Sequence, residues 1–327
     1  MEESYGLTYT LYDVYKDLTQ AEVYGRTLVE LGKKNENIVV LTADLARSTK
    51  IGDFFDAYPD RSFNFGIAEQ NMMSAAAGFA LCGKLPFVST FGVFASMRTA
   101  EQVRTDIAYP RLKVRIIGTH SGVSFGQAGT THHCTEDIGI FRTMANMTLI
   151  VPADSVETSK VLEASIDYPG PIYIRIGRGF EPPAYEDGNY EYEIGKAITM
   201  REGNDITIIA CGIGVLPACE VSDTLADDGI GVRVINMHTI KPIDKEAIIN
   251  AVNETRAIIT VEEHNIIAGL GGAVSEIMAQ AGLSTKLKRM GLPDIYATIG
   301  YPEDLYKKYK LDYDGILDAV QEMYNSL

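Results

Sequence analysis

Gly66-Ile67-Ala68-Glu69-Gln70-Asn71 places one carboxylate at the entrance to a long, nearly uncharged stretch, Met72 to Leu81, which is expected to form a helix. Burial disfavours the charged form of a carboxyl group, so an enclosed Glu69 could hold a proton or make a short hydrogen bond. The alternative is that Glu69 only supports the first turn, where an acid interacts favourably with the helix dipole. The flanking residues favour the first interpretation.

A short apolar strand with aromatic residues at its end follows the expected helix. Residues 84–94 read Lys-Leu-Pro-Phe-Val-Ser-Thr-Phe-Gly-Val-Phe, so that a glycine lies between Phe91 and Phe94. A flat aromatic wall beside a buried acid suits the ring of a heteroaromatic cofactor. The alternative is a pair of ordinary core aromatics.

Three of the five histidines of the chain lie in one glycine-rich loop, residues 119–133. They are His120, His132 and His133. Histidines clustered in a loop indicate metal binding or proton transfer. Because no cysteine or carboxylate stands at the usual zinc spacing around them, proton transfer is favoured and no metal ligand is expected in this chain.

Composition restricts the class of partner. A length of 327 residues corresponds to about two domains, each large enough for a substantial core. The net charge of -15 argues against nucleic acid or an anionic membrane as a partner, since either would require a basic face. No secretory signal or membrane-spanning run is recognisable, so a cytoplasmic location is expected.

Strand-like apolar runs alternate with helical periods, which is the pattern of a mostly parallel α/β sheet. The first set of expected strands covers 38–42, 86–90, 114–118 and 172–176, with helices at 21–32, 74–81, 99–108 and 155–167. A second set has strands at 206–210, 232–235 and 257–261 and helices at 216–226, 245–252 and 271–281. Residues 180–193, with two prolines, a glycine and several acids, are expected to link domains at 1–179 and 194–327.

These features together resemble the transketolase family of thiamine-diphosphate enzymes, and in particular the carboxyl-terminal half, which some members carry as a separate polypeptide. The matching motifs cover nearly the whole chain in a shared order, at residues 42–45, 63–71, 90–91, 119–120, 129–132, 152–154 and 173–178. The resemblance implies a pyrimidine-binding thiamine-diphosphate domain with helices on both faces of its sheet. A smaller α/β transketolase carboxyl-terminal domain would follow it.

The resemblance also implies a set of cofactor-binding residues. Glu69 would hydrogen-bond a ring nitrogen of the pyrimidine and activate the cofactor, which makes it catalytic. Phe91 would stack on the pyrimidine, and Phe94 and Ile67 would line its pocket. The remaining cofactor contacts, at the end of a strand that meets the partner, would be Asp44 and Leu45.

Substrate contacts are implied in the same way. His120 and His132 would contact donor and acceptor oxygens and take part in catalysis, whereas Ser48 and Arg178 would hold a distant phosphate. Arginine suits that role because its planar fork bonds two anionic oxygens at once. Arg98 has no firm family counterpart, but its place shortly after the aromatic wall makes it a candidate pocket residue.

Two departures from the family pattern concern specificity. Members usually carry an arginine for substrate phosphate where this chain has Ala21, and an aspartate for a substrate hydroxyl where it has Ala128. The loss of one anion contact and one hydroxyl contact could cost a few kcal/mol with an ordinary sugar phosphate. The preferred ketose is therefore expected to be modified, for instance branched or ending in a sulfonate.

The Gly-Asp-Gly motif by which the family holds magnesium and diphosphate does not occur in this sequence. By resemblance it belongs to an amino-terminal partner subunit, with which this chain would form an α2β2 assembly, and the chain alone should be inactive. The leading hypothesis is a split transketolase that transfers a two-carbon ketol unit from a ketose to an aldose.

Two alternatives stay open. One is another thiamine enzyme, either a deoxyxylulose-phosphate synthase or the beta subunit of a 2-oxo acid dehydrogenase; the other is a catalytically silent scaffold. Residues 262–264 and the glycine-rich segment 269–272 weakly suggest a metal or phosphate site, although the match to a phosphate-binding loop is only partial.

Overall fold

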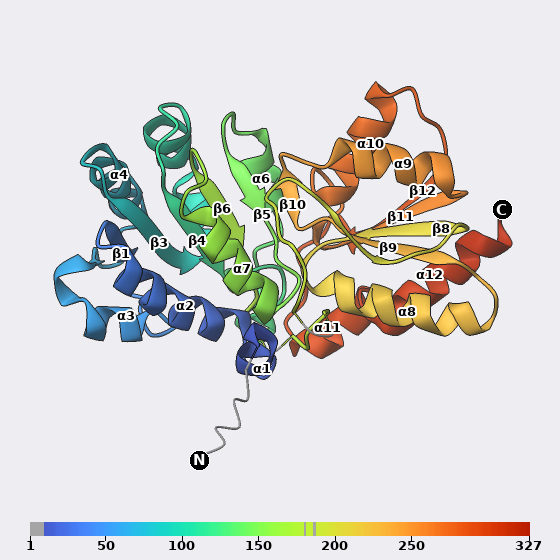
Figure 1. Cartoon of the computed structure of the whole chain (residues 1–327), viewed down its shortest axis with the longest axis horizontal. Helices are drawn as coiled ribbons and strands as arrows, with labels where there is room; N and C mark the ends of the chain where they lie inside the picture. The colour runs from blue at the N-terminus through green and yellow to red at the C-terminus, as the bar shows by residue number, and fades with distance from the viewer. Residues whose placement is uncertain (1–9, 180, 186–187) are drawn as a thin grey trace, which may run out of the picture.

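A computed structural model describes residues 10–179, 181–185 and 188–327, which form two α/β units side by side (Figure 1). In the described residues the first unit has a seven-stranded sheet of order β10-β5-β6-β4-β3-β1-β2. Its strands are β1 (Ile38–Thr42), β2 (Ser62–Asn64), β3 (Leu85–Phe91), β4 (Arg115–Thr119), β5 (Thr148–Ile150), β6 (Ile172–Arg175) and β10 (Thr239–Lys241). Neighbouring strands are parallel except for β10, which pairs antiparallel with β5.

Helices cover both faces of this sheet. The helical segments of the first unit are α1 (Leu11–Tyr15), α2 (Gln20–Lys34), α3 (Gly52–Ala57), α4 (Glu69–Leu81), α5 (Ala100–Gln102), α6 (Asp137–Thr143) and α7 (Ser155–Ser165). Because side chains alternate along a strand, Ile38 and Val40 pack under α2 and α7 on one face, whereas Val39 and Leu41 pack under α4 and α6 on the other. The apolar strands therefore read as continuous hydrophobic runs, as expected when both faces are buried.

The second unit has a sheet of order β12-β11-β8-β9-β7 in the described residues. Its strands are β7 (Ile198–Arg201), β8 (Ile206–Ala210), β9 (Val232–Asn236), β11 (Ala257–Asn265) and β12 (Lys286–Leu292), and its helices are α8 (Val215–Asp227), α9 (Lys245–Glu254), α10 (Leu270–Gln280), α11 (Pro302–Lys308) and α12 (Tyr313–Asn325). The chain leaves β9 and adds β10 to the edge of the first sheet before it returns to the second. The two units therefore share a sheet edge as well as a connecting segment.

A group of buried charges joins the two units. Arg175, at the end of β6, donates to both oxygens of Asp137 over 2.9 and 3.1 Å, and to the backbone oxygens of Cys134 and Glu263 over 3.0 and 2.8 Å. Arg175 is 3% exposed and Asp137 is fully buried. A second carboxylate, that of Glu263 on β11, lies 3.8 Å from the guanidinium. Burial raises the pKa of Glu263 to about 7, against the opposing effect of the Arg175 charge.

The segment predicted as a linker is packed where the structure describes it; Phe180, Glu186 and Asp187 lie outside the described residues. The Ala184 amide donates to Asp154 over 2.8 Å, and the Tyr185 hydroxyl donates to Glu157 over 3.0 Å. The rings of Tyr185 and Tyr190 stack with their centroids 3.7 Å apart. Residues 1–9 of the predicted first domain also lie outside the described part. The predicted domain limits therefore stay a prediction.

The predicted strands are confirmed to within about four residues at their ends, and the largest difference is at β11, which continues to Asn265. The predicted helices agree to within about two residues, except that the helix predicted at 74–81 begins five residues earlier, at Glu69. The helix predicted at 99–108 is confirmed as helical, but only the short α5 is α-helical, and it is followed by a π-helical turn at Val103–Ala108. Another π-helical turn precedes it at Phe94–Arg98. In the described part of the chain, no helix combines the length and apolar character that crossing a bilayer requires.

The buried ion group yields a stability prediction. Arg175→Met would leave the charge of Asp137 buried without its partner, so we expect the free energy of unfolding to fall by about 3–5 kcal/mol. Urea unfolding followed by circular dichroism measures this change. Arg201→Met is the control, because Arg201 pairs with the half-exposed Asp223 and its loss should cost about 1 kcal/mol or less. Equal effects of the two substitutions would show that the buried group does not hold the units together.

Candidate active site

The carboxyl ends of the parallel strands meet along one edge of the first sheet, where ligands bind in such folds. Asp44 follows β1, His120 follows β4, and Arg178 lies three residues beyond β6. Asp44 and His120 have φ angles of 63° and 58°, in the left-handed region that residues with a side chain seldom adopt. Such backbone strain is concentrated at functional sites, which supports this edge as the candidate site.

An aromatic cluster occupies the centre of this edge. It consists of Phe91, Phe94, His120, Phe125 and His132. The Phe91 ring centroid lies 4.1 Å from that of His120, 5.6 Å from that of Phe94 and 6.0 Å from that of His132. The structure thus brings together four predicted site residues from two segments of the chain. The fifth, Phe125, was missed, although its place in the histidine loop was an available signal.

His120 is neutral in this setting. Its side chain is buried, and Nδ1 lies 2.9 Å from the Thr119 hydroxyl. Burial, with smaller effects from the charges of Arg178 and His132, lowers the pKa of His120 to about 3. A neutral imidazole has one donor and one acceptor nitrogen, so His120 can exchange hydrogen bonds with substrate oxygens at neutral pH.

His133, by contrast, stabilises the loop itself. Its Nε2 lies 3.1 Å from the Gly126 carbonyl oxygen, and burial lowers its pKa. The same loop is closed by mutual backbone hydrogen bonds between Gly122 and Cys134. Gly122, at a φ of 58°, is required there because a Cβ atom would lie 2.1 Å from the Glu263 carboxyl carbon.

Glu69 is the first residue of α4 and is only 5% exposed. Its carboxylate accepts a hydrogen bond from Nη1 of Arg98 over 2.6 Å. The guanidinium carbon of Arg98 in turn lies 3.8 Å from the centroid of the Phe94 ring. Through Arg98, the predicted acid is therefore connected to the aromatic cluster.

Asn64 ties the remaining cofactor candidates together, a role that the sequence did not reveal although Asn64 lies within a quoted motif. Its Oδ1 accepts from the amides of Asp44 and Gly66 over 2.9 and 3.0 Å, and its Nδ2 lies 3.3 Å from Asp44 Oδ1. The Leu45 amide donates to the Thr42 hydroxyl over 3.3 Å. The loop after β1 is thereby held against the loop that carries Ile67.

A cavity of about 600 Å³ opens beside this loop. Ile67, Glu69, Met97 and Arg98 are among the residues that line it, and Ile67 is 79% exposed. An exposed apolar side chain beside a buried acid fits a ring of mixed apolar and polar character, provided that a second surface closes the cavity. The residues present therefore fit the aminopyrimidine part of thiamine diphosphate.

The predicted substrate residues are only partly gathered. The guanidinium of Arg178 lies 4.8 Å from the Phe125 ring centroid, at the aromatic cluster. Gln20 fixes the backbone before it, since Gln20 accepts from the Gly177 amide over 2.7 Å and donates to the Pro152 oxygen over 3.0 Å. Ser48 is exposed on the loop after β1, and it is not among the residues of the aromatic cluster.

The two alanines differ in their surroundings. Ala21 is 3% exposed and packs with Tyr24 and Leu28 in the core beneath α2. An arginine could not simply be added there, because its charge would enter the core. Ala128 is half-buried in a tight turn of the histidine loop, where an aspartate could reach solvent or substrate.

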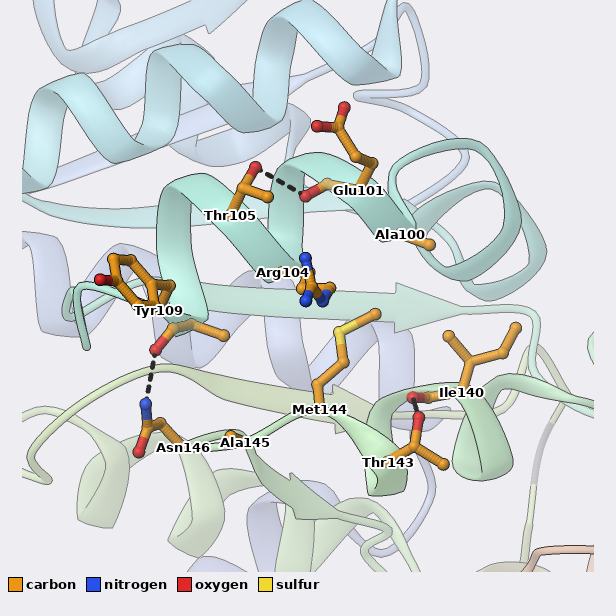
Figure 2. Close-up of a pocket in the computed structure, with 11 residues that line it drawn as sticks. Ala100, Glu101, Arg104, Thr105, Tyr109, Ile140, Thr143, Met144, Ala145 and Asn146 are labelled. Atoms are coloured by element: carbon orange, nitrogen blue, oxygen red, sulfur yellow. Dashed lines mark hydrogen bonds between the residues drawn. The ribbon is translucent and has the colours of Figure 1, made fainter.

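A larger cavity, about 800 Å³, lies elsewhere (Figure 2). Its walls are the helical run from Ala100 to Tyr109 and the end of α6 with the segment after it, to Asn146, and Arg104 lies between them. Because both walls lead into the amino ends of β4 and β5, the cavity extends away from the aromatic cluster. None of the predicted site residues, all of which the structure describes, lines it.

The glycine-rich start of α10 is already occupied. The carboxylate of Glu262 accepts from the amides of Leu270 and Gly271 over 2.6 and 2.9 Å. A side chain of the same unit thus takes the position that a bound phosphate would need at this helix start. These amides are therefore not available to a phosphate, which agrees with the only partial match of 269–272 to a phosphate-binding loop.

Two family models match the chain: the transketolase pyrimidine binding domain over residues 16–181, and the transketolase C-terminal domain over residues 195–316. The chain is 39% identical to one of the subunits of the apulose-4-phosphate transketolase of Phocaeicola vulgatus, covering 90% of this chain and 94% of that protein. It is 36% identical to the 6-deoxy-6-sulfo-D-fructose transketolase subunit SqwH of a Clostridium species, covering 92% and 93%.

A solved structure shows the same architecture. It is a split-gene transketolase in the form of an inactive beta4 tetramer, with 40% sequence identity and a TM-score of 0.85, covering 94% of this chain and 99% of that one. Family model, sequence identity and fold agree over nearly the whole chain. The protein belongs to the transketolase family of thiamine-diphosphate-dependent enzymes and is similar to the separate carboxyl-terminal subunits of its split members.

Proposed function

We propose that this chain is the pyrimidine-binding subunit of a split transketolase, which transfers a two-carbon ketol group from a ketose to an aldose. The observation that carries the proposal is the buried carboxylate of Glu69, joined through Arg98 to an aromatic cluster that contains two histidines. This combination provides a partner for a heteroaromatic ring and hydrogen-bonding groups for a sugar at one edge of a sheet.

Thiamine diphosphate, when bound, supplies the carbon nucleophile that takes up and releases the ketol unit. Glu69 would hydrogen-bond the pyrimidine ring nitrogen, while Phe91 and Phe94 hold the ring and exclude water from it. Asp44 and Leu45, held to the Ile67 loop by Asn64, would meet the cofactor where the partner closes the cavity.

On the substrate side, His120 and His132 would bind the sugar oxygens and move protons at them. The burial that keeps His120 neutral supports this role, because a neutral ring can both donate and accept. Arg178 would bind the terminal anion by its planar fork, with Ser48 nearby once substrate is present, and Arg98 would belong to the same pocket.

The site requires a second chain. Ile67 and Met97, which line the cavity beside Glu69, are 79% and 49% exposed, which supports a partner that covers them. We infer that this partner is an amino-terminal subunit with a Gly-Asp-Gly motif that holds Mg²⁺ and diphosphate, in an α2β2 assembly. The related chain that forms an inactive tetramer of beta chains is consistent with a need for the other subunit.

The alternatives are less well supported. The chain spans 94% and 93% of two transketolase subunits but 47% of a 1-deoxy-D-xylulose-5-phosphate synthase of similar identity. A silent scaffold would have no use for a buried acid, an aromatic cluster and a neutral histidine together. The cytoplasmic location stays a prediction from the sequence.

One prediction concerns the partner. Because this chain has groups for the pyrimidine but not for the diphosphate, the isolated chain should bind no detectable thiamine diphosphate in calorimetry. Addition of the Gly-Asp-Gly subunit with Mg²⁺ should restore binding. Tight binding by the isolated chain would refute the assignment of diphosphate binding to the partner subunit.

Another prediction concerns Glu69. Glu69→Gln keeps the volume and removes the acid, so assembly should persist while turnover by the complex falls about 100-fold or more. The assay is ketol transfer under conditions in which the chemical step limits the rate, with assembly checked by size-exclusion chromatography. A variant that retains more than about a tenth of the activity would show that Glu69 is not the activating acid.

The last prediction for this site concerns the substrate. Two relatives act on apulose 4-phosphate and on 6-deoxy-6-sulfo-D-fructose, which supports a modified ketose for this chain. In a panel of donors, kcat/KM should be lower for xylulose 5-phosphate and fructose 6-phosphate than for a branched or sulfonated ketose. Values of about 10⁴ M⁻¹s⁻¹ or more with the ordinary phosphates would contradict a specialised substrate.

Ala128→Asp is the sharper variant for this test, because Ala128 is half-buried in a turn whereas Ala21 lies in the core. We expect the aspartate to shift the ratio of kcat/KM about fivefold toward the ordinary phosphates, the effect of roughly 1 kcal/mol in the transition state. Ala21→Arg is the comparison for stability. Because its charge would be buried in the core, we expect the free energy of unfolding to fall.

A further inference from the structure

Arg98 contacts both groups that the cofactor ring would need, the Glu69 carboxylate and the Phe94 ring. Its guanidinium donates to Glu69 over 2.6 Å and lies 3.8 Å from the centroid of the Phe94 ring. The side chain of Arg98 is 45% exposed, whereas that of Glu69 is 5% exposed. Of the two partners, Arg98 is therefore the one that can move away without disturbing the core.

A guanidinium group resembles an aminopyrimidine edge in its physical properties. It is planar, carries N–H donors in its plane, and can lie over an aromatic ring while it binds a carboxylate. In the function proposed above, the pyrimidine would lie against the same aromatic cluster and hydrogen-bond the same carboxylate. The ring and the guanidinium cannot hold this position together.

We propose that Arg98 is a placeholder for the pyrimidine ring, which neutralises Glu69 in the free chain and leaves when thiamine diphosphate enters. This inference rests on the proposed function. Its physical reason is that a nearly buried carboxylate without a counter-charge is costly, and the free chain has neither cofactor nor partner subunit to provide one.

The local backbone suits such a movement. Phe94 and Arg98 are the two ends of a π-helical turn, four residues apart, so both side chains lie on one side of the helical run. Such turns are uncommon and occur frequently at functional sites. Met97 and Arg98 line the open cavity beside Asn71, so the guanidinium can turn outward into that space.

The placeholder lowers the apparent affinity for the cofactor. When the competent state is only a fraction of the population, the apparent dissociation constant rises by the inverse of that fraction. Removal of Arg98 should therefore tighten binding. Loss of a positive charge near an anionic cofactor would ordinarily weaken binding, so the sign of the change separates the two effects.

The experiment is calorimetric titration of the assembled two-subunit complex with thiamine diphosphate in Mg²⁺. Arg98→Met should bind about three- to tenfold more tightly than the unaltered complex. Arg104→Met is the matched control, because Arg104 is an exposed arginine on the same helical run and lines the other cavity; its affinity should change less than twofold. Weaker or unchanged binding by the Arg98 variant would overturn the placeholder.

A second measurement uses the free chain and needs no cofactor. In a thermal-unfolding cycle of Glu69→Gln, Arg98→Met and the double variant, the shifts in midpoint should be non-additive, because each substitution removes the same ion pair. Additive shifts would overturn the pairing itself. If the unaltered complex fails to bind thiamine diphosphate, the proposed function is overturned instead, whereas binding without tightening in Arg98→Met overturns only the placeholder.

Discussion

One buried guanidinium, that of Arg175, determines the shape of the candidate site although it does not belong to it. Arg175 donates to the Cys134 oxygen, and Cys134 is joined by backbone hydrogen bonds to Gly122. The Glu263 carboxylate, paired with the same guanidinium, accepts from the Val123 amide over 2.8 Å. Both ends of the loop that carries His120, Phe125 and His132 are thereby fixed to the second unit. The carboxyl-terminal unit thus contributes to the site through the conformation of this loop.

The parallel topology explains why the site residues meet. Strands β1, β3, β4 and β6 run in one direction, so their carboxyl ends share one edge whatever their separation in sequence. Asp44, His120 and Arg178 lie just beyond these ends, and Phe91 is the last residue of β3. The strands must keep their apolar residues to build the sheet. The loops beyond the strand ends have no such requirement and can therefore hold the functional side chains. The left-handed backbone at Asp44 and His120 marks the points at which the chain turns out of the sheet.

The fold was largely predictable because its central strands are continuous apolar runs. Residues 38–42 and 206–210 were predicted with the bounds that the structure has, since both faces of these strands are buried. β2 and β5 were missed because each has three residues, and β10 because its partner is almost a hundred residues away. The π-helical turns could not be predicted, since their apolar spacing reads as an ordinary helix. For the candidate site, motif order predicted Glu69, Phe91, His120 and His132, whereas the hydrogen bonds made by Asn64 and Gln20 depend on the register between distant segments.

The antiparallel strand β10 has a consequence for how this chain can be divided. It completes the edge of the first sheet with residues 239–241, well beyond the end of that sheet's other strands. A polypeptide cut in the connecting segment would leave β5 as an unprotected edge, with free amide and carbonyl groups that could pair with another copy. A related chain, 40% identical to this one, is a split-gene transketolase whose own chain is covered to 99%. Because β10 pairs with β5, a cut between the two units of this chain would be costly. The amino-terminal fragment would become prone to aggregation.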